Sequence, residues 1–76
     1  MNKPMNETIN ELLSVINGWT ADGSLINVSD LSAITGIHIG WVSICLKVAE
    51  ERKLVRKERV GNNIFLHVTN RYLMSL

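Results

Sequence analysis

The sequence predicts an α+β fold in which three helices form the core, followed by a β-hairpin and a short C-terminal helix. Residues 5–17 and 42–49 carry apolar side chains at helical spacing. Between them, residues 28–35 form a short apolar stretch that ends at a glycine, a residue that favours helix termination. Residues 54–60 and 64–69 are strand-like runs separated by three turn-forming residues. These observations define the predicted order of elements.

The length and composition indicate one domain spanning residues 1–76. The chain is 46% hydrophobic and 20% charged, which is typical of a folded domain. It contains no apolar run of about 18 residues, the length needed for a membrane span, and no signal-peptide pattern. The single cysteine, Cys45, has no partner for an internal disulfide. We therefore expect an intracellular, cytoplasmic protein with no membrane partner.

The first predicted helix is a packing helix. Pro4 suits its first turn, and Asn6 or Thr8 can cap it, with Thr8 and Glu11 in capping-box spacing. We expect the helix to end at Gly18. Its apolar residues share one face: Met5, Ile9, Leu12, Leu13 and Ile16. Trp19 follows the glycine and is expected to fold back onto the core.

A short strand, Leu25-Ile26, is expected before the second helix. Asn27 or Ser29 can cap that helix, and Asp30 places negative charge where the helix dipole favours it. The helix is predicted to stop at about Thr35, before Gly36. Leu31 and Ile34 lie three residues apart and are expected to face the same side.

The third predicted helix runs to about Arg52 and has two distinct faces. Its apolar face should be buried and comprises Val42, Cys45, Leu46 and Ala49. Its opposite face comprises Gly40, Ser43, Ile44, Lys47 and Glu51. A short helix, a glycine turn and a second helix with a free face describe a helix-turn-helix, here over residues 28–53.

The hairpin spans residues 54–69 and turns at Gly61, Asn62 and Asn63. Strand alternation predicts that Ile64, Leu66 and Val68 face the helices and that Phe65 and His67 lie on the other side. Asn70 can cap the last helix, which carries the apolar residues Tyr72, Leu73 and Leu76. These residues either pack on the first helix or form a homodimer contact together with it.

The runs DLSAITGI, WVSICLKVAEERKLV and RKERVGNNIFLHV carry a family resemblance over roughly residues 25–69. This region resembles the winged helix-turn-helix of small stand-alone transcription regulators of plasmids and viruses, including those of archaea. The resemblance implies that Trp41-Val42-Ser43 begins the recognition helix and that Lys53-Leu54-Val55 leads into the wing, residues 54–69. Family members usually carry Ser, Thr, Arg or Gln at the exposed recognition positions, where this chain has Ile39, Gly40, Trp41 and Ile44.

Charge is distributed unevenly although its total is only +1. Residues 1–37 hold one base, Lys3, against four acids, a balance of −3. From His38 onward seven bases stand against three acids, a balance of +4. Five of these bases lie within eight residues: Arg52, Lys53, Arg56, Lys57 and Arg59. A basic segment next to an exposed helix face is typical of a nucleic-acid-binding surface.

These features predict a double-stranded DNA-binding protein that regulates transcription. Lys47 and Ser43 are expected in the major groove, Ile44 against thymine methyl groups, and His38 or the nearby helix amides at a phosphate. Trp41 belongs either to the core or to a contact with sugar. The wing bases are expected to neutralise phosphates. The complete predicted interface is His38, Gly40, Trp41, Ser43, Ile44, Lys47, Arg52, Lys53, Arg56, Lys57, Arg59, Asn62 and Asn63.

The sequence also bears on two other classes of function, an enzyme and a protein-interaction module. An enzyme is not expected, because the chain has no recognisable acid–base or nucleophile–base spacing and no glycine-rich phosphate loop. His38, Cys45 and His67 lack the spacing of metal ligands, so no metal or cofactor is expected. Alternatively, Trp41, Ile44 and Val48 form an apolar stripe at i, i+3 and i+7, which would suit a protein-interaction module.

Overall fold

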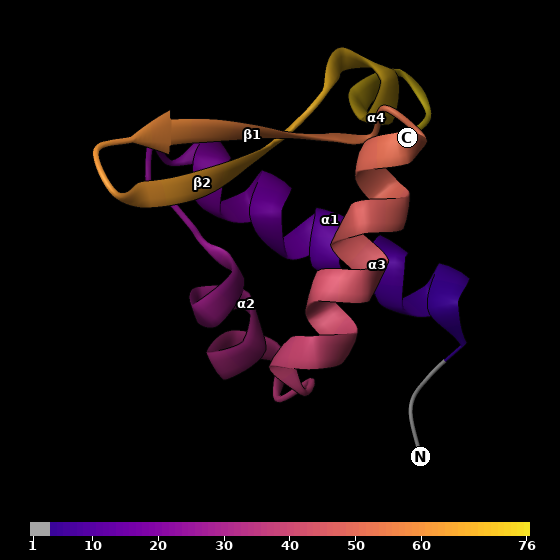
Figure 1. The fold of residues 1–76 in the computed structure, drawn as a ribbon. Coiled ribbons are helices and arrows are strands. Elements are labelled where there is room, and N and C mark those ends of the chain that lie inside the picture. Colours follow the sequence, from indigo (N-terminus) through magenta and orange to yellow (C-terminus); the bar gives the residue numbers. More distant parts are fainter. Residues whose placement is uncertain (1–3) are drawn as a thin grey trace.

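The computed structural model describes residues 4–76, so Lys3 lies outside the described residues. The chain forms an α+β fold with three helices, a two-stranded antiparallel hairpin and a short C-terminal helix (Figure 1). The elements are α1 (Met5–Ala21), α2 (Val28–Thr35), α3 (Ile39–Glu51), β1 (Val55–Val60), β2 (Asn63–Val68) and α4 (Asn70–Met74). The hairpin and the short C-terminal helix follow the three helices in the predicted order.

Helix α1 is longer than the sequence predicted, because it continues through Gly18 to Ala21. Gly23 supplies the left-handed residue that ends it, with φ of 83°. The Gly23 amide donates to the Thr20 carbonyl at 3.0 Å, and the Ser24 amide donates to the Trp19 carbonyl at 3.1 Å. This pair of bonds is the Schellman pattern, which satisfies the last carbonyls of the helix. The predicted stop at Gly18 was therefore wrong.

The start of α1 also differs from the prediction. Pro4 occupies the cap position, and no side chain caps the first turn. Thr8 lies within the helix and is fully buried, and its hydroxyl donates to the Pro4 carbonyl at 3.2 Å. The predicted capping roles of Asn6 and Thr8 were wrong. Trp19 was expected in the core, but 41% of its surface is exposed.

The buried face of α1 agrees with the prediction. Ile9, Leu12, Leu13 and Ile16 are each at most 2% exposed, and Met5 packs against their edge. They meet the buried residues of α3 and Leu31 of α2 in a single core. Burial of a large aliphatic side chain contributes about 1.5 to 3 kcal/mol relative to leaving it exposed, so this cluster accounts for much of the stability of a small domain.

Helix α2 is capped at both ends as expected. The Asn27 side chain accepts from the Asp30 amide at 2.8 Å, and the Asp30 carboxylate accepts from the Asn27 amide at 3.2 Å. Gly36 ends the helix with φ of 73°, and its amide donates to the Ser32 carbonyl. Leu31 is buried, whereas Ile34, three residues later, is 45% exposed.

The turn between α2 and α3 spans residues 36–38, and the two helices are bent by 119° relative to one another. This bend directs α3 away from α2 and leaves one face of α3 uncovered by it. The buried face of α3 is the predicted one, because Val42, Cys45, Leu46 and Ala49 are each at most 2% exposed.

The hairpin pairs Val55 with Val68 at its base and Val60 with Asn63 at its tip. Only Gly61 and Asn62 lie between the strands, and Gly61 has φ of 63°, as a type II′ turn requires. The predicted strand at Leu25-Ile26 did not form; instead the Leu66 amide donates one bond to the Ile26 carbonyl at 2.9 Å.

Leu66 and Val68 face the core as predicted, whereas Ile64, nearer the tip, is 47% exposed. The strand face expected to pack on the helices is therefore covered near the base of the hairpin and exposed near its tip. The part of the hairpin near the tip extends beyond the helical core (Figure 1).

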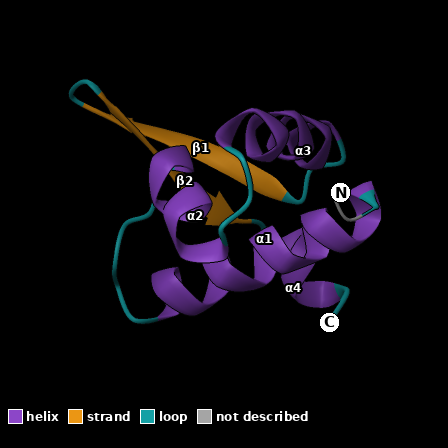
Figure 2. Cartoon of the chain, turned by 90° about the horizontal axis from the view of Figure 1, so that it is seen from below, coloured by secondary structure: helices purple, strands orange, loops and turns teal. Residues whose placement is uncertain are grey.

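Helix α4 begins at a cap one residue earlier than predicted. The hydroxyl of Thr69, not the side chain of Asn70, accepts from the Tyr72 amide at 3.3 Å. Tyr72 is buried in the core, whereas Leu73, Met74 and Leu76 remain exposed. Helix α4 lies beside α1, on the side away from α3 (Figure 2). In the described part of the chain, no single helix is both long and apolar enough to cross a membrane.

Candidate nucleic-acid interface

The uncovered face of α3 contains the residues that the helical period predicted. Gly40, Ser43, Ile44, Lys47 and Glu51 are all exposed. Lys47 forms no ion pair within the described residues, so its ammonium group is available to a ligand. This face therefore presents one free cation, one hydroxyl, one large apolar side chain and one carboxylate.

The side chain of His38 caps the start of α3. Its Nδ1 accepts from the Gly40 amide at 3.0 Å. A Cβ atom at residue 40 would lie 3.2 Å from that Nδ1, which explains why a glycine suits this position. Since Nδ1 accepts, the proton of the neutral ring is on Nε2. The exposed Nε2–H can then donate to an anionic oxygen near the helix start.

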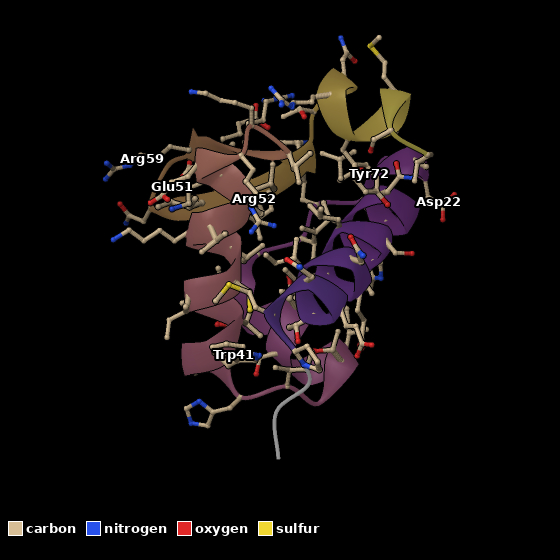
Figure 3. The ribbon with its side chains drawn as sticks, turned by 90° about the vertical axis from the view of Figure 1, so that its right-hand side faces the viewer. Asp22, Trp41, Glu51, Arg52, Arg59 and Tyr72 are labelled. Atoms are coloured by element: carbon tan, nitrogen blue, oxygen red, sulfur yellow. The ribbon has the colours of Figure 1, made fainter. Side chains whose placement is uncertain are left out.

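Trp41 packs toward α1. It is half-buried against the core, and its indole Nε1–H donates to the Thr8 hydroxyl at 3.3 Å. Figure 3 shows Trp41 at the lower part of α3, on the side of α1. Val48 is also half-buried and packs on the core. Of the apolar stripe Trp41, Ile44 and Val48, only Ile44 is well exposed, at 51%.

The two faces of the hairpin separate the predicted wing bases. Lys57 pairs with buried Leu66, and Arg59 pairs with Ile64, so both lie on the strand face that packs on the helices. Arg56 pairs with His67 and lies on the opposite face. The three bases therefore do not form one continuous row.

Lys57 is held near α3, whereas Arg59 contacts the turn of the hairpin. The Lys57 ammonium lies 3.5 Å from the Glu50 carboxylate of α3, with both side chains about half exposed. The Arg59 side chain is exposed; its Nε–H donates to the Gly61 carbonyl at 3.4 Å, and its terminal nitrogens form no hydrogen bond or ion pair within residues 4–76. Arg59 and Glu51 extend from the same side of the molecule (Figure 3). The hairpin thus adds a cation on the side of the molecule from which Glu51 of α3 extends.

Arg52 belongs to a different part of the surface. Its Nη1–H donates to the Asn6 side chain of α1 at 3.2 Å. In Figure 3 it lies between α3 and α1 and not on the side of Arg59. Lys53 follows directly and is exposed, with φ of 63°, the only non-glycine residue with positive φ in the described chain. The basic side chains of residues 52–59 therefore do not share one surface: Arg52 lies toward α1, Arg56 lies on one face of the hairpin, and Lys57 and Arg59 lie on its other face.

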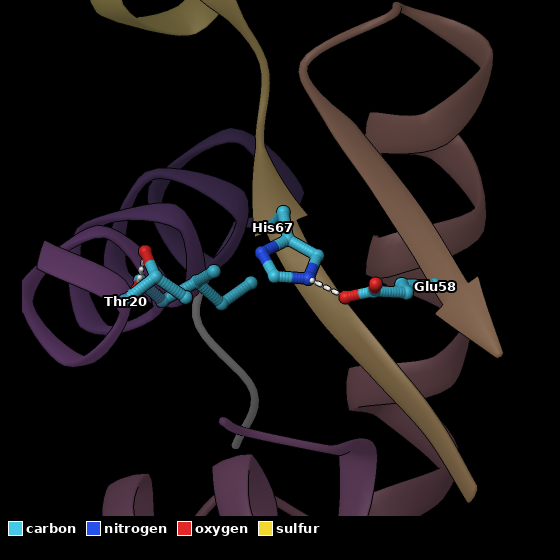
Figure 4. Close-up of polar contacts among 4 residues, drawn as sticks. Thr20, Glu58 and His67 are labelled. Carbon is cyan, nitrogen blue, oxygen red and sulfur yellow. Dashed lines mark hydrogen bonds and ion pairs between the residues drawn. The ribbon is translucent and has the colours of Figure 1, made fainter. Parts of the chain in front are cut away.

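The opposite face of the hairpin carries a hydrogen bond between His67 and Glu58. His67 Nε2 lies 2.7 Å from the Glu58 carboxylate (Figure 4). Thr20, also drawn in Figure 4, lies in α1, and its hydroxyl donates to the Ile16 carbonyl of the same helix at 2.8 Å. His67 lies on the predicted side of the strand, yet only 18% of its side chain is exposed. Glu58 reduces the positive charge around Arg56 on this face.

The tip of the hairpin contains Asn62 and Asn63, both exposed. Their amide groups offer donors and acceptors that suit contacts to sugar and phosphate. Asn63 is the first residue of β2 and not part of the turn, as the pairing with Val60 shows.

The described residues do not bring together any three His, Cys, Asp or Glu side chains in metal-binding geometry. Cys45 is fully buried, and this burial raises the pKa of its thiol. A thiol that resists ionisation is a poor nucleophile and a poor metal ligand.

One acid of α3, Glu50, was not predicted to be part of this surface, and it pairs with Lys57. Glu51 lies on the uncovered face one turn beyond Lys47, as the helical spacing predicted. The Glu50–Lys57 contact depends on how the hairpin folds back onto α3, and no local pattern predicts it.

Comparison with known proteins gives no match: no family model, no curated protein and no solved structure is significantly similar to the chain.

Proposed function

We propose that the chain is a winged helix-turn-helix protein that binds double-stranded DNA and regulates transcription. Helix α3 is the recognition helix, and the β1–β2 hairpin is the wing. The observation that carries the proposal is that Glu51, on the uncovered face of α3, and the exposed side chain of Arg59 extend from the same side of the molecule. An extended duplex could contact that face and Arg59 at once.

The geometry of α2 and α3 supports the proposal. Helix-turn-helix pairs are joined by three or four residues at about 90° to 120°, and the 119° bend across residues 36–38 falls within that range. Helix α3 has 13 residues, a length of about 20 Å. The major groove is about 12 Å wide and accepts a helix of this diameter.

Each side chain then has a distinct role. Lys47 and Ser43 reach base edges from the centre of the uncovered face. The His38 Nε2–H donates to a phosphate at the start of α3, where the helix dipole also favours an anion. Arg59, Lys57 and Lys53 neutralise phosphates along the wing. Asn62 and Asn63 contact the backbone from the tip.

Arg52 and Arg56 contribute less than the sequence suggested. Arg52 is directed toward Asn6, and Arg56 lies on the other face of the hairpin from Arg59. Both add to the general positive field, which favours association with a polyanion over distances of about a Debye length.

The interaction-module alternative needs a free stripe of Trp41, Ile44 and Val48. Because Trp41 and Val48 pack on the core, that stripe is reduced to one well-exposed residue. This observation favours DNA over a protein partner for the uncovered face of α3.

Fluorescence anisotropy with labelled DNA tests the proposal. Duplexes enriched by the protein from a random-sequence library should bind more tightly than random duplexes and single strands. Lys47→Ala should cost about 1 to 3 kcal/mol on an enriched duplex and much less on random DNA, because only a base contact distinguishes the two. Arg71→Ala removes an equal charge from α4 and is the matched control. The absence of any enrichment over random duplexes would contradict the proposal.

A further inference from the structure

We propose that the uncovered face of α3 reads thymine methyl groups through Ile44, so that the preferred sites are recognised by an apolar contact in the major groove. This inference rests on the proposed function. It assigns the chemical group that gives α3 its sequence preference, whereas DNA binding itself depends mainly on cations.

The first observation is the small number of polar groups available to bases on this face. Of its five exposed residues, only Ser43 and Lys47 can donate hydrogen bonds. Glu51 is an acceptor that duplex phosphates repel, and it lies in the last turn of the helix. Two donors distinguish few base pairs, so most of the contact area must come from another kind of group.

The second observation is the exposure of Ile44. It lies midway along α3 and at one edge of the uncovered face, about 60° around the helix from Lys47 and about 40° from Gly40 by the helical period. More than half of its surface, 51%, is exposed, and among the other large apolar residues of α3 only Ile39, at 44%, is also exposed. A β-branched side chain in a helix is held in one preferred rotamer, so its methyl groups are fixed in direction.

The third observation is the bare backbone one turn before Ile44. Gly40 lies four residues earlier on the same side, and a Cβ there would lie 3.2 Å from the Nδ1 of His38, which is a tight contact. No side chain at residue 40 therefore shields Ile44 from an approaching surface. The glycine also lets the start of the helix come close to a groove wall.

Among the groups in the major groove, the thymine C5-methyl is the apolar one. A methyl group that leaves water against an aliphatic side chain contributes a factor of about four in affinity, since burial of one carbon is worth about 0.8 kcal/mol. Deoxyuridine differs from thymidine by this methyl group alone and keeps every hydrogen-bonding group of the base pair. Replacement of thymine by uracil therefore isolates the proposed contact.

The test uses duplexes that the wild-type protein has enriched from a thymine-containing random library. Each enriched duplex is then made again with uracil at single thymine positions, and affinities are measured by anisotropy at constant salt. We expect a loss of about fourfold at one or two positions. Ile44→Ala should bind the two forms equally, and Lys47→Ala should still distinguish them.

Leu73→Ala is the matched control, because it removes a similarly exposed leucine, 45%, from α4. It should retain the wild-type ratio between thymine and uracil duplexes. Circular dichroism tests whether Ile44→Ala is folded. We expect that it is, because alanine is the best helix former. If Ile44→Ala binds too weakly to measure, Ile44→Val keeps part of the contact and should show a reduced ratio.

Three outcomes would overturn the inference. Equal affinity of the wild type for thymine and uracil duplexes would remove the methyl contact and leave DNA binding intact. Unchanged discrimination in Ile44→Ala would assign the methyl contact to another residue. Failure to bind any duplex would remove the proposed function as well and would favour a protein partner for Ile44.

Discussion

Thr69 holds the backbone of Lys53 in its left-handed conformation. The Thr69 hydroxyl donates to the Lys53 carbonyl at 2.6 Å, and the Thr69 amide donates to the adjacent Leu54 carbonyl at 3.1 Å. The amides of Lys53 and Leu54 donate back to the carbonyls of Glu50 and Ala49, which completes a Schellman end for α3. The two ends of the hairpin are thus joined at the residue where the helix stops.

Lys53→Gly should make the domain more stable and weaken its binding to DNA. The position has φ of 63°, which glycine adopts without the steric cost of about 1 kcal/mol that a side chain bears. A lysine kept at such a position is best explained by a contact of its side chain. Thermal unfolding and a duplex titration measure the two effects.

Lys53→Ala separates charge from strain in that experiment. It removes the ammonium group and leaves a Cβ at positive φ, so binding should weaken as in Lys53→Gly without the gain in stability. Unchanged binding in both variants would show that Lys53 lies outside the DNA interface.

Leu46→Ala should lower the free energy of unfolding by about 2 to 5 kcal/mol, because it removes a buried side chain from the junction of α3 with the core. Lys47→Ala alters the next residue, which is exposed, and should change stability by less than about 0.5 kcal/mol. Denaturant unfolding followed by circular dichroism measures both. A similar, small effect in the two variants would show that the buried face of α3 has been assigned wrongly.

Cys45 should make stability depend on pH in alkaline solution. Burial raises the pKa of this thiol above its ordinary value of 9.0, so the folded state holds the proton more strongly than the unfolded state. The resulting stabilisation is complete below pH 9.0 and is lost as the pH rises through the higher folded-state pKa. The difference in unfolding free energy between the wild type and Cys45→Ala should therefore shrink as the pH rises above 9.0. A constant difference would contradict the burial of the thiol.

The exposed residues of the C-terminal tail predict a homodimer. Leu73, Met74 and Leu76 are 45%, 85% and 78% exposed. They belong to α4 and the residues after it, and α4 lies on the side of α1 away from α3, so pairing through α4 would leave the uncovered face of α3 free (Figure 2). Replacement of Leu73 and Leu76 by serine should convert a dimer into a monomer in sedimentation experiments. Ile64→Ser, on the hairpin, is the control and should remain dimeric. A wild-type monomer at every accessible concentration would exclude this contact.

Local chemistry made α2 and α3 predictable from sequence. The Asn27 cap and the Gly36 terminator each have one strong structural preference, and both act as expected. Helix α1 offered two glycines, and the first was chosen wrongly as its end. Gly18 stays helical because an interior glycine costs only about 1 kcal/mol, whereas Gly23 adopts the positive φ that stops the helix.

The candidate interface was only partly predictable. Helical period identified the uncovered face of α3, and strand alternation could have shown that Arg56 faces away from Lys57 and Arg59. The contacts of Lys57 with Glu50, Arg52 with Asn6 and Trp41 with Thr8 join residues of different elements. Such contacts depend on how the helices and hairpin pack together, which the order of residues along one element does not encode.

The most direct test of DNA binding by α3 and the hairpin compares the salt dependence of two arginine variants. Arg59→Ala and Arg52→Ala remove equal charge, but only Arg59 extends from the same side of the molecule as Glu51 of α3, whereas Arg52 contacts Asn6 of α1. Each phosphate contact contributes about −0.9 to the slope of log affinity against log salt. We predict that Arg59→Ala reduces the magnitude of this slope by about 0.9 on enriched and random duplexes alike, and that Arg52→Ala leaves it nearly unchanged. Equal slopes for the wild type and Arg59→Ala would contradict the placement of the hairpin on DNA.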